Sequence, residues 1–405
     1  MNKTHDMDVV IIGAGIVGLG IGVGLLRLQP KTRVLILESE TELALHGSGR
    51  NSGVIHAGFY YPPGSLKASL TSTGNELLRQ MCRDENVLVR DVGKVVVVRG
   101  QEEIPRLMDL ATRAEANGVN VELIDEKRLY KIEPLARTHL AAIWSPSTAV
   151  ADPIEVTKAM ALVFQRLGGE VRLSAPVKQI IDSGVVLKAH GERIRARHVV
   201  NAAGLYADKL AHSSGAGNNY VVLPFKGLYL YGSGASPPLQ RHVYPVPDPR
   251  NPFLGVHLTV TVAGQSKIGP TAIPALSRLN YTKLGGIRPD ELLGIVTNLP
   301  KFLFSPHHDG FGLIRSELPK YLRRVLVKQA QVLVPSITTT QFTNWGKSGI
   351  RAQLFNVREK RLEMDFVVER NGSHTHVLNA VSPAWTGSLS FGRHIAAGVI
   401  DSLDG

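Results

Sequence analysis

Val9-Val-Ile-Ile-Gly13-Ala-Gly15-Ile-Val-Gly18 is the stretch of this 405-residue chain that decides its fold. The β-branched run at its start is typical of a buried parallel strand. Gly13 allows the tight turn after that strand, and Gly15 lets the backbone approach a pyrophosphate. Gly18 lets the following helix lie close to the sheet, with its N-terminus facing the phosphates. The stretch therefore predicts a strand, a turn and a helix that bind a dinucleotide.

A second predicted strand, residues 33–38, strengthens this interpretation because it ends in Glu38, twenty residues after Gly18. A carboxylate at that position can accept hydrogen bonds from ribose hydroxyls. An acid there, rather than a basic residue, argues against a 2′-phosphate. Strand, turn, helix, strand and acid follow one another in the expected order, so the sequence predicts an adenine dinucleotide.

The same region invites a competing interpretation, because residues 9–26 carry no charge over eighteen residues, which is long enough for a membrane span. Six of these residues are glycines, three of them at the dinucleotide spacing, and Asp6 and Asp8 precede the run. No small-residue cleavage site lies before the strand that ends at Glu38. We therefore expect neither a span nor a signal peptide here.

The composition predicts a large core and two intimately joined domains. Cys82 is the single cysteine, which excludes an internal disulfide framework and a cysteine-based metal cluster and fits a cytoplasmic protein. The pairs His307-His308 and His374-x-His376 lack a companion cysteine or acid at ligand spacing, so we expect surface histidines and no metal site.

The net charge of +12 is concentrated in one window, residues 315–361, where ten Lys and Arg face two acidic residues, a local balance of +8. Within it, residues 318–328 alternate apolar and basic positions at helical spacing. A basic amphipathic helix of this kind is attracted to anionic membrane surfaces. The alternative is a solvated helix face near a pocket for an anionic substrate. No nucleic-acid-binding module is recognisable, so we expect no nucleic acid.

The rest of the chain contains two kinds of segment, one with strands and helices and one with short strands separated by turns. Residues 152–169 predict a helix that Asp152 caps and glycines end. Residues 197–208 predict a strand, a turn of small residues and a helix, and residues 376–400 predict a strand followed by a helix. Between these segments, short strands separated by Pro and Gly turns indicate a mainly antiparallel sheet. The fold class predicted is α/β, with a discontinuous Rossmann-like dinucleotide-binding domain (residues 1–90, 151–214 and 346–405) and an inserted α+β substrate domain, built on a mainly antiparallel sheet (residues 91–150 and 215–345).

Four strings carry a family resemblance that spans nearly the whole chain: Asn51-Ser-Gly-Val-Ile-His56-Ala-Gly-Phe-Tyr60-Tyr61-Pro-Pro-Gly-Ser-Leu-Lys67-Ala, Tyr244-Pro-Val-Pro-Asp-Pro, Phe253-Leu-Gly-Val-His257-Leu-Thr259 and Gly349-Ile-Arg351-Ala-Gln353. With the dinucleotide motif, they resemble flavoproteins of the D-amino-acid-oxidase and glycerol-3-phosphate-dehydrogenase superfamily. Within that superfamily, the chain is most similar to the L-2-hydroxyglutarate dehydrogenases/oxidases.

The resemblance implies FAD as the cofactor and assigns three groups of residues to it. Gly13, Gly15 and Gly18 would hold the pyrophosphate and Glu38 the adenosine ribose. Asn51, Ser52 and Gly53 would lie along the phosphates and the flavin, and Ala203 and Gly204 would make a second nucleotide contact. Gly387 and Ser388 would lie at a helix N-terminus near the flavin pyrimidine, where the positive end of the helix stabilises the reduced, anionic ring.

Oxidation of a 2-hydroxy acid requires a base within hydrogen-bond reach of the hydroxyl, and histidine suits this role because its pKa lies near working pH. His257 is our first candidate for the base, and His56 is expected near the flavin or the substrate carboxylate. Arg351 can clamp a carboxylate with two parallel hydrogen bonds. Lys226 is the candidate second cation for a distal carboxylate, and Tyr61 and Tyr244 are candidate hydrogen-bond donors.

The function predicted is FAD-dependent oxidation of L-2-hydroxyglutarate, a small dicarboxylate 2-hydroxy acid, to 2-oxoglutarate, with electrons passed to a quinone or another acceptor. The alternatives are an amine or amino-acid oxidase or a glycerol-3-phosphate dehydrogenase of the same superfamily and, more remotely, a basic flavin-containing protein that binds RNA or a membrane. We expect a cytoplasmic protein. The basic segment leaves one further option open, which is peripheral binding to the inner face of a membrane.

Overall fold

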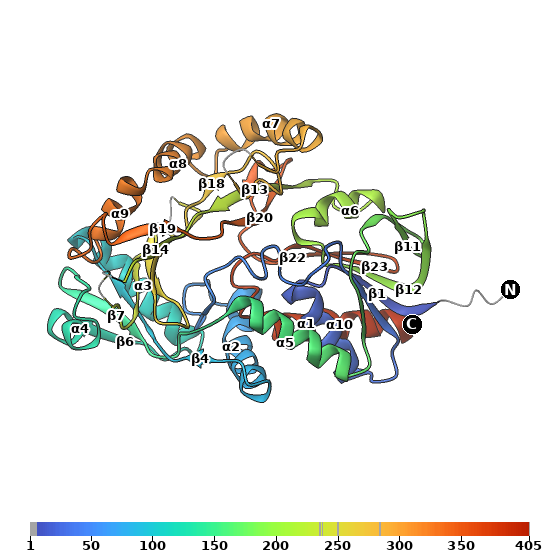
Figure 1. Ribbon diagram of the computed structural model, residues 1–405, viewed down its shortest axis with the longest axis horizontal. Helices are drawn as coiled ribbons and strands as arrows, with labels where there is room; N and C mark the ends of the chain where they lie inside the picture. Colours follow the sequence, from blue (N-terminus) through green and yellow to red (C-terminus); the bar gives the residue numbers. More distant parts are fainter. Residues whose placement is uncertain (1–5, 235, 237, 249–250, 283–284, 405) are drawn as a thin grey trace.

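The computed structural model describes residues 6–234, 236, 238–248, 251–282 and 285–404. Pro249, the last residue of the string that begins at Tyr244, lies outside these residues. The fold is α/β, as predicted. It combines a Rossmann-like parallel sheet with a second sheet that is mainly antiparallel (Figure 1).

The parallel sheet has the order β9-β2-β1-β12-β23, and β22 and the β10–β11 hairpin extend it in antiparallel pairing. Its strands are β1 Met7–Ile12, β2 Val34–Leu37, β9 Glu170–Arg172, β10 Val177–Ile181, β11 Gly184–Leu187, β12 Arg193–Asn201, β22 Val367–Asn371 and β23 His374–Asn379.

Alternation along β1 explains why this strand can lie in the middle of the sheet. Val9 and Ile11 pack against the helices on one face, whereas Val10 and Ile12 pack towards β10, β11 and Leu210 on the other. Figure 1 shows α1, α5 and α10 on the first face and α6 on the second. The uninterrupted apolar run is therefore the consequence of burial on both faces.

The α-helices and 3-10 helices run in chain order through both parts of the fold. They are α1 Ile16–Leu28, α2 Leu66–Asp84, η1 Gln101–Glu103, α3 Ile104–Ala116, α4 Glu126–Ile132, α5 Pro153–Arg166, η2 Gly204–Tyr206, α6 Ala207–Ser213, α7 Pro289–Leu303, α8 Gly310–Glu317, η3 Leu318–Tyr321, α9 Arg323–Gln331 and α10 Ser388–Asp404. As predicted, Asp152 caps α5, because its carboxylate accepts hydrogen bonds from the first amides of that helix.

Helices α1 and α10 lie side by side and run in the same direction, in contact through glycines. A Cβ atom on Gly20 would overlap the Ser388 carbonyl, and a Cβ on Gly24 would lie 3.0 Å from the Gly392 carbonyl. The glycines in the N-terminal uncharged run therefore serve close helix packing. None of the described helices is both long enough and apolar enough to cross a membrane.

The second sheet has the order β19-β14-β17-β16-β15-β5-β7-β6, with β5 and β15 as its only parallel pair among the described strands. Its strands are β5 Lys94–Val97, β6 Glu122–Asp125, β7 Ala141–Ser145, β14 Leu230–Gly232, β15 His242–Pro245, β16 His257–Val260, β17 Ser266–Gly269 and β19 Phe342–Trp345. One face packs on α4 and α9, and the other packs partly on α3.

Two smaller sheets complete the fold. Their strands are β3 Val54–Ile55, β4 Val89–Arg90 and β8 Ala149–Ala151 in the first, and β13 Tyr220–Gly227, β18 Ile273–Pro274, β20 Gly349–Asn356 and β21 Arg361–Leu362 in the second. β20 belongs to a segment assigned above to the FAD-binding part, yet it pairs along its whole length with β13. The division into domains stays a prediction.

Two local expectations were wrong. Residues 318–328 do not form one basic helix, because the backbone becomes extended at Leu322, between η3 and α9. Lys320 is buried and pairs with Glu317, so it does not belong to a solvated basic face. His374 and His376 are buried on β23 rather than exposed, since their positions lie inside a strand that is covered on both faces.

Replacing Gly20 by Ala should lower the free energy of unfolding by about 1–3 kcal/mol, because the added methyl must push α1 away from the α10 backbone. Gly294 is the matched control: it also lies in a helix, and a Cβ added there would meet nothing within 4 Å. G294A should be neutral or stabilising by up to about 1 kcal/mol. Urea unfolding of both variants measures the difference, and a G20A variant as stable as the parent chain would contradict this packing.

Candidate active site

An elongated cavity of about 760 Å³ lies between the carboxyl ends of the parallel strands and the second sheet. Ligands of open α/β sheets bind at this edge. Most of the predicted site residues line it: Gly13, Gly15, Glu38, Asn51, Ser52, His56, Ala203, Gly204, Tyr244, His257 and Arg351. Residues from three separate sheets thus converge on one space.

The dinucleotide turn has the geometry that its glycines predict. Gly13 has φ +103°, and a Cβ there would lie 2.6 Å from the Ala202 carbonyl oxygen. Gly18 does not line the cavity, but a Cβ on it would overlap the Gly13 carbonyl, so it allows α1 to start directly after the turn. The Glu38 carboxylate accepts a hydrogen bond of 2.8 Å from the Ala14 amide, which holds the acid beside the turn.

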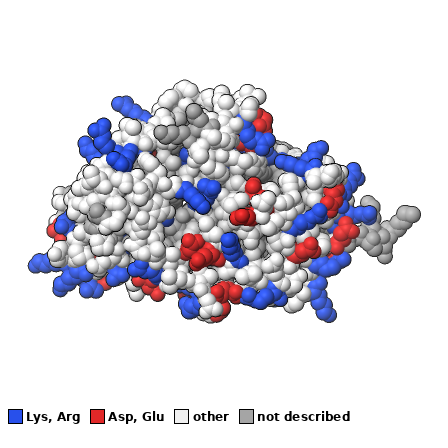
Figure 2. Space-filling model, viewed as in Figure 1, with Lys and Arg blue, Asp and Glu red and all other residues white. Residues whose placement is uncertain are grey.

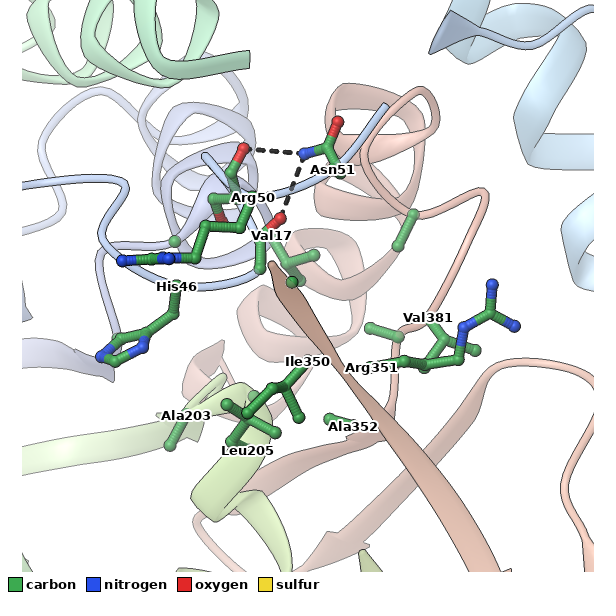
Figure 3. Close-up of a pocket in the computed structure, with 18 of the residues that line it drawn as sticks. Val17, His46, Arg50, Asn51, Ala203, Leu205, Ile350, Arg351, Ala352 and Val381 are labelled. Carbon is green, nitrogen blue, oxygen red and sulfur yellow. Dashed lines mark hydrogen bonds between the residues drawn. The ribbon is translucent and has the colours of Figure 1, made fainter. Parts of the chain in front are cut away.

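The loop after the second strand is shaped by its own polar side chains. The Ser48 hydroxyl accepts a hydrogen bond of 2.8 Å from the Ile16 amide at the start of α1. The Asn51 amide group donates to the Gly47 and Ser48 carbonyls, as the dashed lines of Figure 3 mark, and its oxygen accepts from the Gly53 amide. Gly53 lies behind the lining at φ +72° and supports the loop rather than facing the cavity.

The N-terminus of α10 reaches the same cavity as that of α1. Trp385 and Thr386 line the cavity, whereas Gly387 and Ser388 lie just behind them. The Trp385 indole N–H and the Ser388 hydroxyl are buried and have no hydrogen-bond partner among the described residues. Two parallel helix N-termini and these orphaned donors suit a ligand with a pyrophosphate and an electron-rich ring, so the residues present fit FAD.

Arg351 provides the positive charge at the other end of the cavity. It lies on β20, and Figure 3 shows its side chain and that of Ile350 on opposite sides of the strand. Its guanidinium lies 5.1 Å from the Phe253 ring centroid and makes no hydrogen bond or ion pair with any residue that the structure describes. Burial lowers the pKa of Arg351 from its usual value, although a guanidinium stays charged at neutral pH. Such a charge, half-buried at the cavity wall, favours an anionic ligand.

His257, on β16, is held in a single tautomer. Its Nδ1–H donates a hydrogen bond of 2.8 Å to the Gly255 carbonyl, which can only accept. The other ring nitrogen, Nε2, therefore carries a lone pair. Burial is the main reason why the pKa of His257 falls to about 3, and the hydrogen bond to Gly255 opposes this shift only in part. At neutral pH the ring is uncharged and its Nε2 can accept a proton, but a pKa of about 3 makes it a weaker base than the expected pKa near working pH would.

Two more predicted residues surround His257. The Tyr244 ring stacks on the imidazole with a centroid distance of 3.9 Å and fixes its orientation. His56 lines the same cavity, and burial lowers its pKa to about 3, with the charges of Lys94 and Arg351 adding to the effect. Both histidines are thus neutral in the same cavity as the Arg351 guanidinium.

Lys226 and Tyr61 are not among the residues that line the cavity. The Lys226 ammonium is buried and donates to Asn280 Oδ1 at 2.8 Å and to the Thr282 carbonyl at 2.7 Å. Tyr61 lies close enough to Ser382 and Arg351 for both to oppose the rise in its pKa that burial causes. The structure therefore places Tyr61 next to the guanidinium and keeps Lys226 engaged elsewhere.

Sequence reasoning did not single out several residues that build the site. Tyr229 and Phe253 line the cavity, and Arg50 lines it beside His46 (Figure 3). Lys94 lies behind Tyr244 with its ammonium 5.0 Å from that ring, fully buried and without a hydrogen-bond partner among the described residues. Its position in the run 93–98 looked like that of an ordinary strand residue, so no local signal marked it.

Comparison with protein families gives one match over nearly the whole chain: residues 8–397 match the FAD dependent oxidoreductase family. Curated relatives include the proteins named L-2-hydroxyglutarate dehydrogenase, mitochondrial, from Caenorhabditis briggsae and Homo sapiens, which are 37% and 36% identical. They align with 97% of this chain and with 93% and 89% of their own lengths. The Escherichia coli L-2-hydroxyglutarate dehydrogenase is 34% identical over 97% of this chain and 93% of its own length.

Solved structures support the fold. An L-α-glycerophosphate oxidase from Mycoplasma pneumoniae with FAD bound superposes with a TM-score of 0.76 at 21% identity, covering 98% of this chain and 95% of that one. A glycine oxidase from Geobacillus kaustophilus gives 0.73 at 20% identity, with coverages of 98% and 95%. Motif, cavity and relatives agree: this chain belongs to the family of FAD-dependent oxidoreductases and, within it, to that of the L-2-hydroxyglutarate dehydrogenases.

Proposed function

We propose that this enzyme oxidises L-2-hydroxyglutarate to 2-oxoglutarate with FAD as its cofactor. The observation that carries the proposal is a half-buried Arg351 guanidinium, without a partner among the described residues, in the same cavity as a neutral His257 with a free Nε2 lone pair. An anion receptor next to a base suits a hydroxy acid. The names of the relatives that align over the full length support the particular substrate.

In this proposal, Arg351 grips the 1-carboxylate of the substrate with two parallel hydrogen bonds. Tyr61, beside Arg351, and Tyr244, beside His257, are donors to the same end of the substrate. The assignment of Lys226 to the distal carboxylate stays a prediction from sequence, because its ammonium donates to Asn280 and Thr282.

His257 accepts the proton of the substrate hydroxyl at Nε2, while its Nδ1–H remains bonded to Gly255. The chemistry that FAD supplies when bound is the acceptance of two electrons as a hydride from C2. Loss of the proton and the hydride leaves the C2 carbonyl of 2-oxoglutarate. Tyr244 keeps the imidazole plane fixed by stacking, so that Nε2 stays directed at the hydroxyl.

We further propose a quinone, or another acceptor, for the electrons. We also propose that the protein is cytoplasmic, bound peripherally to the anionic inner face of a membrane, and divided into the FAD-binding and substrate domains predicted from sequence. The positive balance of the 315–361 window supports contact with an anionic surface. These points are independent of the assignment of Arg351 and His257.

The substrate is tested with the FAD-loaded enzyme, a soluble dye as acceptor and chromatographic detection of the keto acid. L-2-hydroxyglutarate should give 2-oxoglutarate, whereas D-2-hydroxyglutarate, L-lactate, glycerol 3-phosphate and D-alanine should react far more slowly. Preferred turnover of D-alanine or glycerol 3-phosphate would favour the alternatives within the superfamily and reject this substrate.

Replacing Arg351 by Met should lower kcat/KM for L-2-hydroxyglutarate by about 100- to 1000-fold, mostly through KM, because the carboxylate loses its charged partner. Arg351→Lys should recover only part of the loss, since an ammonium cannot form the two parallel bonds. FAD content, read from absorbance, is the control for folding. Unchanged kcat/KM in R351M would remove Arg351 from substrate binding.

Replacing His257 by Asn should reduce kcat by about 100- to 10000-fold with FAD still bound, because the group proposed to take the hydroxyl proton is lost. His139 is exposed and far along the chain, so H139N is the matched control and should retain parental kcat. Steady-state kinetics on both variants make the comparison. If H257N keeps parental kcat, another residue is the base.

The pH profile follows from the lowered pKa of His257. A group whose pKa is about 3 stays deprotonated until the pH falls near that value, so kcat/KM should not decline between pH 8 and pH 5. A histidine with an ordinary pKa near 6.5 would instead lose activity below about pH 6.5. Initial rates in overlapping buffers distinguish the two, and an acid limb near pH 6.5 would contradict the burial of His257 described above.

A further inference from the structure

An exposed apolar patch covers α7, the turn after it, α8 and η3, up to Leu322. It consists of large side chains that each expose 48% to 73% of their area: Leu293, Val296, Phe304, Phe311, Leu318 and Leu322. The Phe304 and Phe311 rings touch edge to face at the surface, with centroids 5.1 Å apart. Exposed apolar side chains gathered over adjoining helices mark an interaction site rather than ordinary surface.

The helices that carry the patch are apolar on both sides. On their inner side, Phe302 of α7 and Leu313 of α8 are buried against Phe225 and Phe355. A helix that packs on a core with one side is expected to be polar on the other. Figure 1 shows α7, α8 and α9 in a row along one edge of the molecule, so this second apolar side faces outward.

Basic side chains surround the patch, and the acids near it are already engaged. The exposed cations on these helices are Lys301, Arg315, Arg323, Arg324 and Lys328. The two exposed acids of residues 289–331 are Asp290, which pairs with Arg288 and Lys209, and Asp309, whose carboxylate caps α8 at the Gly312 amide.

A second basic segment joins this rim. The Ser305 hydroxyl donates a hydrogen bond of 2.6 Å to the Lys360 carbonyl, so the turn 357–360, with Arg358, Lys360 and Glu359, lies at the end of α7 next to Phe304. In Figure 2 the surface over α7 and α8 is mostly white, with blue side chains beside it. The combination of an apolar centre and a positive rim is complementary to a bilayer with anionic headgroups.

We propose that α7, the turn after it, α8 and η3 form a membrane-docking surface that inserts Phe304 and Phe311 among the acyl chains just below anionic headgroups. The docked state is peripheral, because none of the described helices is suited to cross a bilayer. The surface differs from the helix that the sequence predicted: Lys320 faces inward, and the apolar contacts come from α7 and α8.

Docking on this surface would place the cavity close to the bilayer. Phe302, on the buried side of α7, lies 5.7 Å from the Phe225 ring, which lies 4.7 Å from the Phe253 ring. Phe225 and Phe253 line the cavity. A thin aromatic layer thus separates the docked helices from the site, which suits a lipid-dissolved electron acceptor. This last consequence rests on the proposed oxidation, whereas docking deepens the peripheral membrane binding proposed above and is independent of the substrate.

The test is co-sedimentation of the FAD-loaded protein with vesicles of phosphatidylcholine and phosphatidylglycerol, or of phosphatidylcholine alone. The parent chain should bind the anionic vesicles, and salt should weaken binding. Phe304→Ser with Phe311→Ser should lower the partition coefficient by about 10-fold or more at unchanged net charge. Leu88→Ser with Leu140→Ser, two side chains exposed to 60% and 58% elsewhere, is the matched control and should bind like the parent.

The charged rim is tested separately. Arg323→Gln with Arg324→Gln should weaken binding to anionic vesicles by roughly fivefold per charge and leave binding to neutral vesicles unchanged. Lys127→Gln with Lys131→Gln, on α4, removes the same charge from another part of the surface and should have little effect. If the α9 and α4 double substitutions weakened vesicle binding equally, the effect would come from net charge alone. The assignment of the surface would then be wrong.

Turnover with a soluble dye separates docking from the proposed function, because F304S/F311S should keep parental activity in that assay. Failure of the parent chain to bind anionic vesicles at low salt would overturn the proposal, whatever its substrate. So would a parent chain that light scattering shows to be a dimer and that F304S/F311S converts to a monomer, since the patch would then be an interface between two copies.

Discussion

Helices α1 and α10 approach so closely that no side chain fits between them at Gly20, and the site depends on this contact. A Cβ on Gly20 would overlap the Ser388 carbonyl, and Gly392 meets the α1 backbone in the same way. Because the two helices run in the same direction, both N-termini arrive at the carboxyl edge of the parallel sheet. Their positive ends and the turn at Gly13 together form the half of the cavity that suits a pyrophosphate and a flavin.

The other half of the cavity combines a charged arginine with two neutral histidines. Arg351 is a charged group without a partner among the described residues, whereas His56 and His257 are kept neutral by burial and by the nearby charges of Lys94 and Arg351. A half-buried cation without a protein partner is only partly solvated, and an anionic ligand can supply the partner it lacks. The same burial makes His257 a proton acceptor rather than a second cation. The same cavity thus combines a site for the substrate carboxylate with a proton acceptor.

Much of this could be predicted from the sequence where local geometry carries the signal. The turn at Gly13 and the cap at Asp152 depend on residues a few positions away, and each has the expected structure, whereas the ribose contact of Glu38 stays a prediction. His257 and Arg351, each chosen from its own string, line one cavity although they lie on strands of different sheets, and their roles stay predictions.

Features set by distant neighbours could not be predicted in this way. Lys226 is engaged by Asn280 and Thr282, more than fifty positions away, and Lys320 is turned inward by Glu317. Tyr229 and Lys94 look like ordinary strand residues until the second sheet brings them beside the cavity. The outward apolar face of α7 and α8 could not be predicted either, because the spacing of apolar residues does not say which of them the fold buries.

The most direct test of these roles is a crystal structure of the FAD-loaded enzyme with 2-oxoglutarate bound. We expect a carboxylate of the ligand on the Arg351 guanidinium through two hydrogen bonds, with the C2 oxygen within hydrogen-bond distance of His257 Nε2. A ligand whose carboxylates both lie away from Arg351, or a C2 oxygen that does not reach His257, would contradict the assignment of these two residues.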